Sequence, residues 1–382
     1  MAKTIRKNVL LALAYYEHRM HLGASHFARE ANWILDTRMA HYGTVPPDWR
    51  GDGILTYALP DREDLTRYLR KSRVPIVTLS ADLQSIATAS VVLDNFAIGR
   101  IAGEHLIERG LTNLAFFKCT DYADIREREA GFAAAVDDAD LEYSRIDWHA
   151  VSSEKPRAKM LPWLVRQLKK LPGPLGVMAQ SDHRAYTLEN ACEEAELSVP
   201  VDVAIVGVDN DEYTCDFART PITSVDSNRQ ELAYRGASLL NQLMQGNEPP
   251  EGPIVVPPAG LVVRQSSDVL AIENANVAKA LAFIWQNFRQ PIGVEDIVAA
   301  TNESRCGLYD VFQKHVGRTM RQELERKRIE YAQQLLLSTS DKVSQVAHQC
   351  GFGSGEQFCR VFAKVIGCTP SKYRQLKGNE NC

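Results

Sequence analysis

The chain contains 382 residues, 45% of them hydrophobic and 24% charged, and its formal net charge is −4 at pH 7. This composition is typical of a soluble chain of two or three domains, and no apolar run approaches the roughly 20 residues of a membrane span. Its eight cysteines include no CxxC pair and no Cys/His ligand spacing, which predicts reduced thiols in a cytoplasmic protein and argues against a zinc site or a disulfide framework.

The first apolar segment, Val9–Tyr16, follows Lys3, Arg6 and Lys7, as the apolar part of a secretory signal peptide would. The segment is only eight residues long, and Glu17-His18-Arg19 follows it with no convincing cleavage site. We therefore predict a buried parallel strand, with secretion as the alternative.

From this strand to about residue 245, short apolar runs alternate with helical stretches. The predicted strands are Val9–Ala14, Gly53–Tyr57, Pro75–Leu79, Val91–Leu93, Leu114–Phe117, Leu175–Ala179 and Val203–Val206. The predicted helices are Asp61–Lys71, Ile98–Arg109, Arg126–Val136, Pro156–Leu171, His183–Glu196 and Gln230–Gln245. Such alternation builds parallel sheets with helices on both faces. It predicts two lobes, with a ligand site in a cleft at the carboxyl ends of the strands.

Short motifs in this part resemble the ligand-binding core of LacI/GalR-type regulators, which is related to periplasmic sugar-binding proteins. They are Asp94-Asn95 through Gly99, His105–Gly110, Arg126–Phe132, Ser181-Asp182, Gly207–Asn210 and Thr220–Val225. The resemblance implies a two-lobed, periplasmic-binding-protein-like α/β core. The helix-turn-helix that normally precedes this core is missing, because the first predicted strand begins almost at once.

The same resemblance implies a set of ligand-binding residues. Arg128 matches the arginine that clamps ligand hydroxyls or a carboxylate, and its planar fork suits paired oxygens. Asp209 matches a carboxylate that accepts from sugar hydroxyls, while Ser181 and Asp182 belong to a third binding segment. A cap of the following helix is the alternative for Asp182. Arg126 is a further candidate, with a surface ion pair as its alternative. Tyr16 and Glu17, which follow the first strand in a loop that matches no family pattern, are candidates for closing the cleft, with packing as the alternative for the aromatic ring.

A change in composition marks the end of the core. Five prolines between positions 249 and 258 stiffen the exit from its last predicted helix, and Ser266–Asn276 then leads to a helix predicted over Ala278–Phe288. We predict a ligand-binding core over residues 1–268, a linker over 269–276 and an all-α domain over 277–382.

Two segments of the all-α domain repeat each other at an offset of fifty residues. The first contains Ser304, Leu308, Val311, Phe312, Lys314, Gly317 and Thr319, and the second contains Ser354, Phe358, Val361, Phe362, Lys364, Gly367 and Thr369. Each has the apolar period of a helix and follows a shorter helix candidate, Val294–Ala300 or Val343–Cys350. Two consecutive helix-turn-helix units predict a duplicated DNA-reading domain.

A projection of each second helix at 100° per residue separates an apolar face from a polar one. The candidate base-reading residues of the first copy are Arg305, Cys306, Tyr309, Asp310, Gln313 and Lys314, and those of the second are Glu356, Gln357, Cys359, Arg360 and Lys364. Such groups can reach base edges in the major groove. A polar face that only meets water is the alternative.

The segment between the copies, Thr319–Leu337, contains no Gly or Pro and predicts one helix roughly 28 Å long. This length is comparable with the ~34 Å between successive major-groove faces of B-DNA. Arg321, Arg326, Lys327 and Arg328 are candidates for phosphate contacts on it. Residues 271–382 contain 15 Lys and Arg against 11 Asp and Glu, whereas the rest of the chain is net negative, so the charge favours a DNA partner for this domain.

Residues 276–377 resemble the DNA-binding domain of AraC-type transcription regulators. The matching residues are Gly351-Phe352, Phe358–Lys364 and Gly367–Arg374. Asp310 and Glu356 depart from the family pattern, which often has neutral or basic base readers at these positions. A carboxylate there can accept from a cytosine amino group, but it also repels phosphate.

The sequence thus predicts a ligand-responsive, sequence-specific regulator that activates a sugar operon. The two resemblances imply as partners double-stranded operator DNA, a small sugar such as D-xylose or another pentose, a second copy of the chain and, for an activator, RNA polymerase. No membrane is expected. A sugar receptor or transport protein without a DNA role is the alternative. No P-loop, GxSxG or HExxH motif occurs, so neither an enzyme nor a cofactor nor a metal site is expected.

Overall fold

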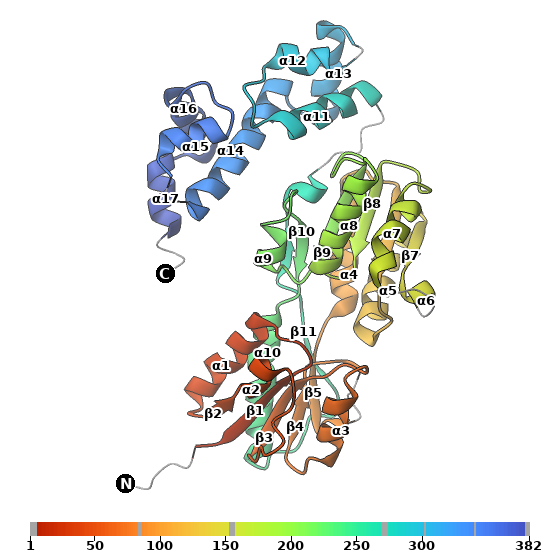
Figure 1. Cartoon of the computed structure of the whole chain (residues 1–382), viewed down its shortest axis with the longest axis vertical. Helices are drawn as coiled ribbons and strands as arrows, with labels where there is room; N and C mark the ends of the chain where they lie inside the picture. Colours follow the sequence, from red (N-terminus) through yellow and green to blue (C-terminus); the bar gives the residue numbers. More distant parts are fainter. Residues whose placement is uncertain are drawn as a thin grey trace. The chain divides into compact units, whose positions relative to one another are not determined.

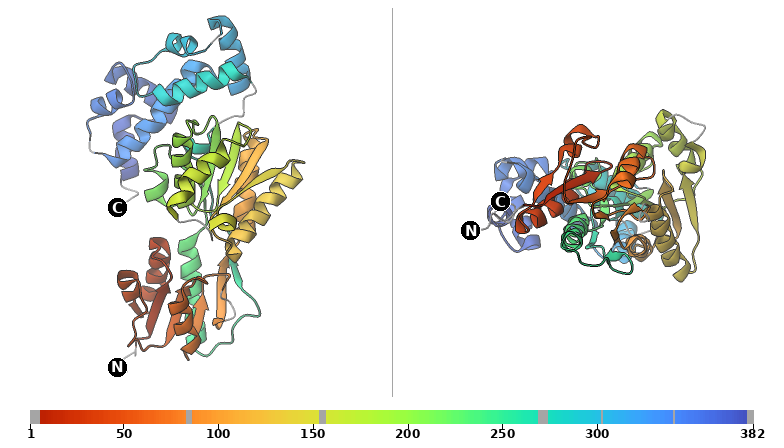
Figure 2. Two further views of the ribbon diagram at one scale, coloured as in Figure 1. Left: turned by 45° about the vertical axis from the view of Figure 1, so that its right-hand side comes forward. Right: turned by 90° about the horizontal axis from the view of Figure 1, so that it is seen from below.

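A computed structural model describes residues 6–82, 86–152, 157–268, 274–301, 303–339 and 341–378. The chain divides into two compact units, residues 1–269 and 270–382 (Figure 1). The first unit is α/β and consists of two lobes, each with its own sheet (Figure 2). The second unit contains only helices in its described part. The predicted fold class is confirmed.

The first lobe has a sheet with strand order β11-β5-β4-β3-β1-β2, in which all neighbouring strands are parallel. Its strands are β1 (Asn8–Leu13), β2 (Ile34–Asp36), β3 (Gly53–Tyr57), β4 (Ile76–Thr78), β5 (Ala89–Leu93) and β11 (Ile254–Val256). Its helices are α1 (His18–Glu30), α2 (Arg38–Tyr42), α3 (Glu63–Lys71) and α10 (Arg229–Met244). Helices α1 and α10 pack closely at Gly23, where a side chain would overlap the carbonyl oxygen of Gln230.

The second lobe has strand order β12-β10-β9-β8-β6-β7, with only β12 antiparallel to its neighbour. Its strands are β6 (Asn113–Lys118), β7 (Tyr143–Asp147), β8 (Leu175–Ala179), β9 (Val203–Val208), β10 (Thr223–Asp226) and β12 (Gly260–Val262). Its α-helices are α4 (Asn95–Glu108), α5 (Ala123–Asp138), α6 (His149–Ser152), α7 (Met160–Leu168), α8 (Asp182–Glu194) and α9 (Glu212–Cys215), with short 3₁₀ turns at Arg157–Lys159 and Gln265–Ser267.

The chain passes between the lobes three times: from β5 to α4, from β10 to α10, and from β11 to β12. All of the predicted strands exist, but sequence patterning missed the edge strands, the interior strand β10 and the helices α1, α2, α6 and α9. The helix predicted over Pro156–Leu171 is observed as α7 over Met160–Leu168, and Pro156 lies outside the described residues. The proline-rich stretch was interpreted only as a stiff exit, yet it contains β11, which pairs with β5. Pro253 and Pro257 flank this edge strand, where missing backbone donors are tolerated.

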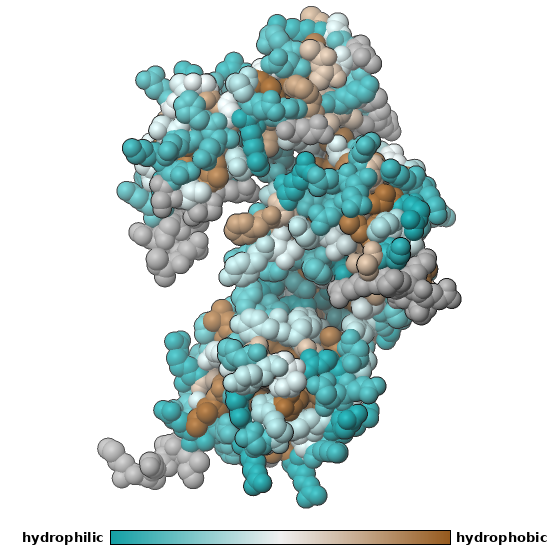
Figure 3. Space-filling model, viewed as in Figure 1, coloured by the Kyte–Doolittle hydropathy of each residue, from teal (hydrophilic) through white to brown (hydrophobic). Residues whose placement is uncertain are grey.

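Each lobe encloses its own buried apolar core. Leu10, Ile54 and Leu65 belong to the core of the first lobe, and Phe117, Leu164 and Ile205 to that of the second. The described surface in Figure 3 is mainly hydrophilic, with small apolar patches. No helix in the described ranges is long and apolar enough to cross a membrane.

The helical unit consists of α11 (Ala275–Asn287), α12 (Val294–Ala299), α13 (Arg305–Val316), α14 (Met320–Ser338), α15 (Val343–Gln349), α16 (Gly355–Ile366) and α17 (Pro370–Gly378). Asn274 caps α11, so this helix begins three residues earlier than predicted, inside the predicted linker. Residues 269–273 of that linker lie outside the described residues. The long connecting helix is confirmed as α14, whose N-cap is Thr319.

The two halves of this unit have separate apolar cores. Leu308, Phe312 and Leu324 lie in the first, whereas Ile329, Phe358 and Phe362 lie in the second. Helix α14 contributes to both cores and therefore joins the halves (Figure 1). We call α12 with α13 the first reading unit and α15 with α16 the second reading unit.

Candidate functional site

The centre of the ligand-site prediction, Arg128, lies on α5 and is 1% exposed. Its Nε donates to Oδ1 of Asn95 at 2.8 Å, and its Nη1 donates to the carbonyl oxygen of Gln180 at 2.7 Å. Its Nη2 is buried, makes no hydrogen bond and lies 3.9 Å from Oδ1 of Asp209. One side of this guanidinium is therefore fixed by the protein, while the other side retains donor capacity next to a carboxylate.

Asp209 directly follows β9 and is held by a second arginine. Arg229 donates from Nε and Nη2 to the two carboxylate oxygens, each at 2.9 Å, and Ser227 donates its hydroxyl at 2.9 Å. Burial alone would raise the pKa of Asp209, but the charges of Arg229 and Arg128 outweigh burial and lower it. Asp209 is therefore an ionised acceptor between two guanidinium groups.

The backbone at this point is unusual as well. Asp209 has φ 107° and Asn210 has φ 53°, both in a region that side-chain-bearing residues rarely adopt. Such conformations persist where the surrounding structure holds them, often at binding sites. Here the Asp209 carboxylate is fixed by Arg229, and the Asn210 amide donates to the Ser224 hydroxyl at 2.9 Å.

Residues from the first lobe complete this junction between the lobes. Nη1 of Arg229 donates to the Tyr15 hydroxyl at 3.1 Å, and its guanidinium lies 5.7 Å from the centre of the Tyr57 ring. The rings of Tyr15 and Tyr57 meet edge to face, with centroids 5.5 Å apart. An aromatic wall beside paired polar groups is a suitable surface for a sugar ring.

Asp182 lies nearby, but its carboxylate is already engaged within the second lobe. It accepts from the Ser224 hydroxyl at 2.6 Å and from the backbone amide of Asp211 at 2.7 Å. Burial, followed by the charge of Asp209, raises the pKa of Asp182 to about 7. Ser181 precedes it as the N-cap residue of α8, without a capping bond from its side chain.

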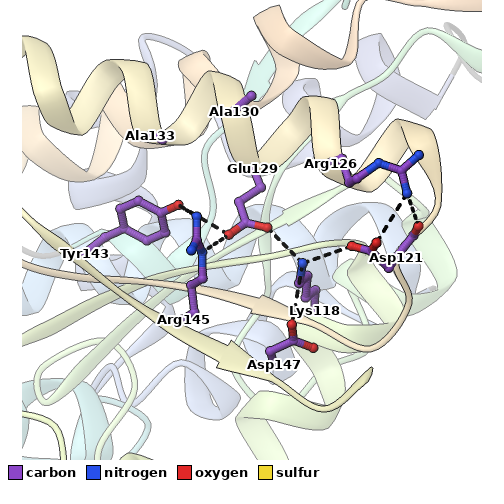
Figure 4. Close-up of a pocket in the computed structure, with 9 residues that line it drawn as sticks. All are labelled: Lys118, Asp121, Arg126, Glu129, Ala130, Ala133, Tyr143, Arg145 and Asp147. Carbon is purple, nitrogen blue, oxygen red and sulfur yellow. Dashed lines mark hydrogen bonds and ion pairs between the residues drawn. The ribbon is translucent and has the colours of Figure 1, made fainter. Parts of the chain in front are cut away.

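Arg126 is placed away from this group. It lies two residues before Arg128 on α5, which turns it to the opposite side of the helix. Its side chain is 55% exposed and pairs with Asp121, as the ion-pair alternative predicted. Figure 4 shows it at one end of a cavity of about 380 Å³ beside α5 and β7.

The charges that line this cavity compensate one another. Lys118 contacts Asp121, Glu129 and Asp147 at 3.1, 3.1 and 3.5 Å, and Glu129 also pairs with Arg145 (Figure 4). The positive charges of Lys118 and Arg145 are thus paired with the carboxylates around them. We therefore locate the candidate ligand site at Arg128 and Asp209 and not here.

The residues predicted after β1 have local roles. Glu17 is the N-cap of α1, accepting from the amide of Met20 at 2.6 Å, while Tyr16 is 56% exposed and packs on His21. The neighbouring Arg19 reaches across the junction, donating to the Asp209 carbonyl and pairing with Asp226 at 3.3 Å. These contacts join α1 to the segment that contains Asp209.

Sequence analysis missed the other half of the site, namely Tyr15, Tyr57, Asn95, Gln180 and Arg229. Four of them lie within two residues of a strand's carboxyl end, where parallel sheets place ligand-binding groups, and this position was a usable signal. Arg229 is 3% exposed at the start of α10. No periodic pattern distinguishes it from an ordinary surface arginine.

The two reading helices, α13 and α16, have the same local construction. Ser304 and Ser354 cap their N-termini, each accepting from the amide three residues later at 3.2 Å. Gly317 and Gly367 end them in left-handed conformations, with φ 73° and 82°. The repeat in the sequence is thus a repeat of helix starts and stops.

The candidate base-reading residues lie on the outward faces of these helices. Exposed side chains are those of Arg305, Cys306, Tyr309, Asp310, Gln313, Lys314, Glu356, Arg360 and Lys364, while Gln357 and Cys359 are half-buried. Leu308, Phe312, Phe358 and Phe362 face inward. The geometry agrees with the helical projection.

The prediction that the basic residues of α14 contact DNA phosphates is wrong for most of them. Lys327 and Arg328 are 2% and 6% exposed, and Arg326 pairs with Glu323 and Glu330, so these three are not available as a phosphate-binding row. Arg321 is exposed and pairs with Glu325 at 3.0 Å. The apolar cores on both sides of α14 bury Lys327 and Arg328, which sequence analysis had predicted as candidates for phosphate contacts.

Comparison with known domain families agrees with both units. A model of a periplasmic binding protein-like domain matches residues 104–267, and a model of a helix-turn-helix domain matches residues 297–376. The described residues contain no cluster of three or more potential metal ligands, and their cysteines are free thiols.

Similarity also extends across the two units. The xylose operon regulatory protein of Escherichia coli (strain K12) is 28% identical over 341 residues, which cover 86% of this chain and 85% of that protein. The protein of the same name from Haemophilus influenzae is 28% identical over 291 residues, or 74% of each chain. The solved structure of a xylose-binding transcription activator matches with TM-score 0.78 and 25% identity, covering 98% of this chain and 99% of that one. These relatives are regulators, which argues against the receptor without a DNA role.

Proposed function

We propose that the chain is an AraC-type transcription regulator with a LacI/GalR-type, periplasmic-binding-protein-like core. It would activate an operon for the use of a pentose, with D-xylose as the first candidate effector. It is a sugar-responsive, DNA-binding protein. The choice of xylose and of activation rests on what the similar proteins are named for. The proposed division is a core over residues 1–268, a linker over 269–276 and a DNA-binding domain over 277–382.

The observation that supports a sugar site most directly is the buried Nη2 of Arg128, which faces ionised Asp209. A hydroxyl group can accept from this nitrogen while donating to the carboxylate, and only a ligand with such dual capacity uses both. We therefore propose Arg128 and Asp209 as principal ligand contacts. Ser181, Asp182, Tyr16 and Glu17 remain as supporting candidates. Arg126 is not proposed as a contact, because it pairs with Asp121 on the opposite side of α5.

For DNA, we propose that α13 and α16 enter successive major grooves. Arg305, Tyr309, Gln313 and Lys314 would face bases or phosphates in one groove, and Arg360, Gln357 and Lys364 in the other, with Cys306 and Cys359 in the contact area. Asp310 and Glu356 would accept from cytosine amino groups. The exposed positions of these side chains support the assignment.

Regulation would require the sugar to bind one arrangement of the protein better than another. We propose that it favours the arrangement in which a cytoplasmic homodimer presents its helical units to paired half-sites. The activator role would then bring RNA polymerase to the promoter.

The test measures sugar and DNA binding on the same full-length protein. Thermal unfolding with D-xylose, other pentoses and hexoses identifies the effector, since a ligand at a hundred times its Kd adds about 2.7 kcal/mol to the unit that it binds. Duplexes enriched from a randomised library then identify the DNA site, and their affinity is measured with and without that sugar. Arg360→Ala should lower the affinity of the protein for the enriched duplex and leave sugar binding unchanged. No shift with any sugar would refute the pentose assignment.

A further inference from the structure

One buried arginine contacts both the loop that leads into the first reading unit and the turn inside the second reading unit. Arg328 lies in the middle of α14, just after Leu324 of the first apolar core and just before Ile329 of the second. It is 6% exposed and therefore hidden from DNA phosphates. Its position at the boundary between the cores makes it a contact residue for both units.

On one side, Arg328 binds the loop that joins α11 to α12. Its Nε donates to the carbonyl oxygen of Phe288 at 2.8 Å, and its Nη2 donates to those of Gln290 and Ile292 at 2.7 and 3.2 Å. These carbonyls follow the C-terminus of α11, where helices leave acceptors without partners. One planar side chain thus binds three alternate carbonyl groups of a loop that leads into the first reading unit.

On the other side, Arg328 contacts the turn between α15 and α16. Its guanidinium carbon lies 5.5 Å from the centre of the Phe352 ring. The neighbouring Gly351, at φ 77°, approaches the same loop so closely that a Cβ there would lie 2.5 Å from the Phe288 carbonyl oxygen. The loop of one half and the turn of the other are therefore in direct contact around this arginine.

These contacts bear on how the two reading units are rotated relative to each other about the axis of α14. The continuous helix α14 sets the separation of the two units along its own axis, but a helix alone does not fix how groups on either side of it are rotated. Contacts away from the axis do so, and Arg328 provides them to both units at once. We propose that Arg328 is a positioning residue that fixes the rotation of one reading helix relative to the other, so that both fit only base sites of one spacing.

The expected behaviour follows from the energetics of linked modules. Two rigidly linked binding units gain about 10²–10⁴ in affinity over either alone, and they lose this gain when their sites cannot be engaged together. Inserting two base pairs between the sites rotates one relative to the other by roughly 70° and moves it roughly 7 Å. Binding should therefore depend strongly on spacing as long as the arginine holds the units in place.

The experiment compares full-length wild type, Arg328→Lys and Arg374→Lys. Lysine keeps the charge but lacks the planar fork, so non-specific attraction to DNA is unchanged. Arg374 is the matched control, because its Nε donates to the Leu336 carbonyl at 2.9 Å within the second half alone. Each protein is titrated with duplexes that wild type enriches from a randomised library: intact, with two base pairs inserted between the two contacted segments, and with one segment scrambled.

Wild type and Arg374→Lys should lose about a hundredfold in affinity on insertion. Arg328→Lys should bind the intact duplex about tenfold more weakly than wild type and lose less than about threefold on insertion, while binding the one-segment duplex as wild type does. Wild-type spacing dependence in Arg328→Lys would overturn the proposal. Equal loss on one-segment and two-segment duplexes would also overturn it, because it would show a role in folding one unit.

The proposal rests on DNA reading by both units, and the design separates the two ideas. If wild type enriches no duplex, DNA reading by α13 and α16 fails and the positioning role fails with it. If wild type enriches a two-segment site and Arg328→Lys matches it on every duplex, only the positioning role fails.

Discussion

Arg128 and Arg126 form a natural pair of test and control, because they lie on the same helix with opposite surroundings. Arg128 is buried with one nitrogen directed towards Asp209, whereas Arg126 is exposed and paired with Asp121. Hydrogen bonds to a charged group contribute about 1.5–3 kcal/mol each. Arg128→Lys should therefore weaken binding of the effector sugar by about tenfold to a hundredfold, and Arg126→Lys should leave it unchanged, as calorimetry would measure. Equal affinity in Arg128→Lys would remove this residue from the site.

Asp182 makes a prediction about pH. Its pKa in the folded protein is raised to about 7 by burial and by the charge of Asp209, against about 3.9 in an unfolded chain. The folded state therefore binds this proton more tightly, and the stability that the protonated carboxyl contributes is present below pH 4 and lost as pH rises towards 7. Asp182→Asn stays neutral, so its free energy of unfolding should rise relative to that of wild type between pH 5 and pH 8. Urea unfolding at both pH values tests this, and a pH-independent difference would contradict it.

At the scale of elements, the close packing of α4 and α5 positions Arg128. A Cβ at Gly99 on α4 would overlap the carbonyl oxygen of Arg128, and one at Gly131 on α5 would overlap that of Phe96. Gly99→Ala should force the helices apart, destabilise the core by about 1–3 kcal/mol and weaken sugar binding. Gly252→Ala is the control, since nothing lies within 4 Å of a Cβ there. The prediction fails if both variants bind sugar and unfold as wild type does.

These packed helices also show what the sequence could reveal. The motif from Asp94 to Gly99 was noticed only as a resemblance, and three of its residues now have a physical role. Asp94 caps α4 by accepting from the amide of Ala97 at 2.9 Å, Asn95 holds Arg128, and Gly99 permits the close approach of α5. Local signals of this kind are readable in a sequence because each depends on one or two neighbouring residues.

Other elements were harder to predict from the sequence, also for physical reasons. Strands β2, β11 and β12 have only three residues each, too few to establish a period, and β7 mixes polar and apolar residues at the sheet edge. Arg229 joins the site through contacts with Tyr15 and Asp209, which lie 214 and 20 residues away in the chain. Such contacts depend on how the lobes come together, which no local pattern records.

For the whole molecule, the central question is how a sugar at the core affects DNA binding by the helical unit. If the sugar changes the affinity for operator DNA by some factor, DNA must change the affinity for the sugar by the same factor, because both equilibria share one thermodynamic cycle. We expect a factor of about 5–150, the range of typical coupling free energies. Calorimetric titration of the sugar with and without saturating enriched duplex, and titration of that duplex with and without saturating sugar, measure the two factors independently. The Arg328→Lys variant should bind DNA more weakly than wild type. Without DNA, this variant should bind the sugar with wild-type affinity, because Arg328 lies within the helical unit. Two factors that agree and differ from one would establish that the units are energetically coupled. Sugar binding that leaves DNA affinity unchanged would show that the signal reaches transcription by another route, such as a contact with RNA polymerase.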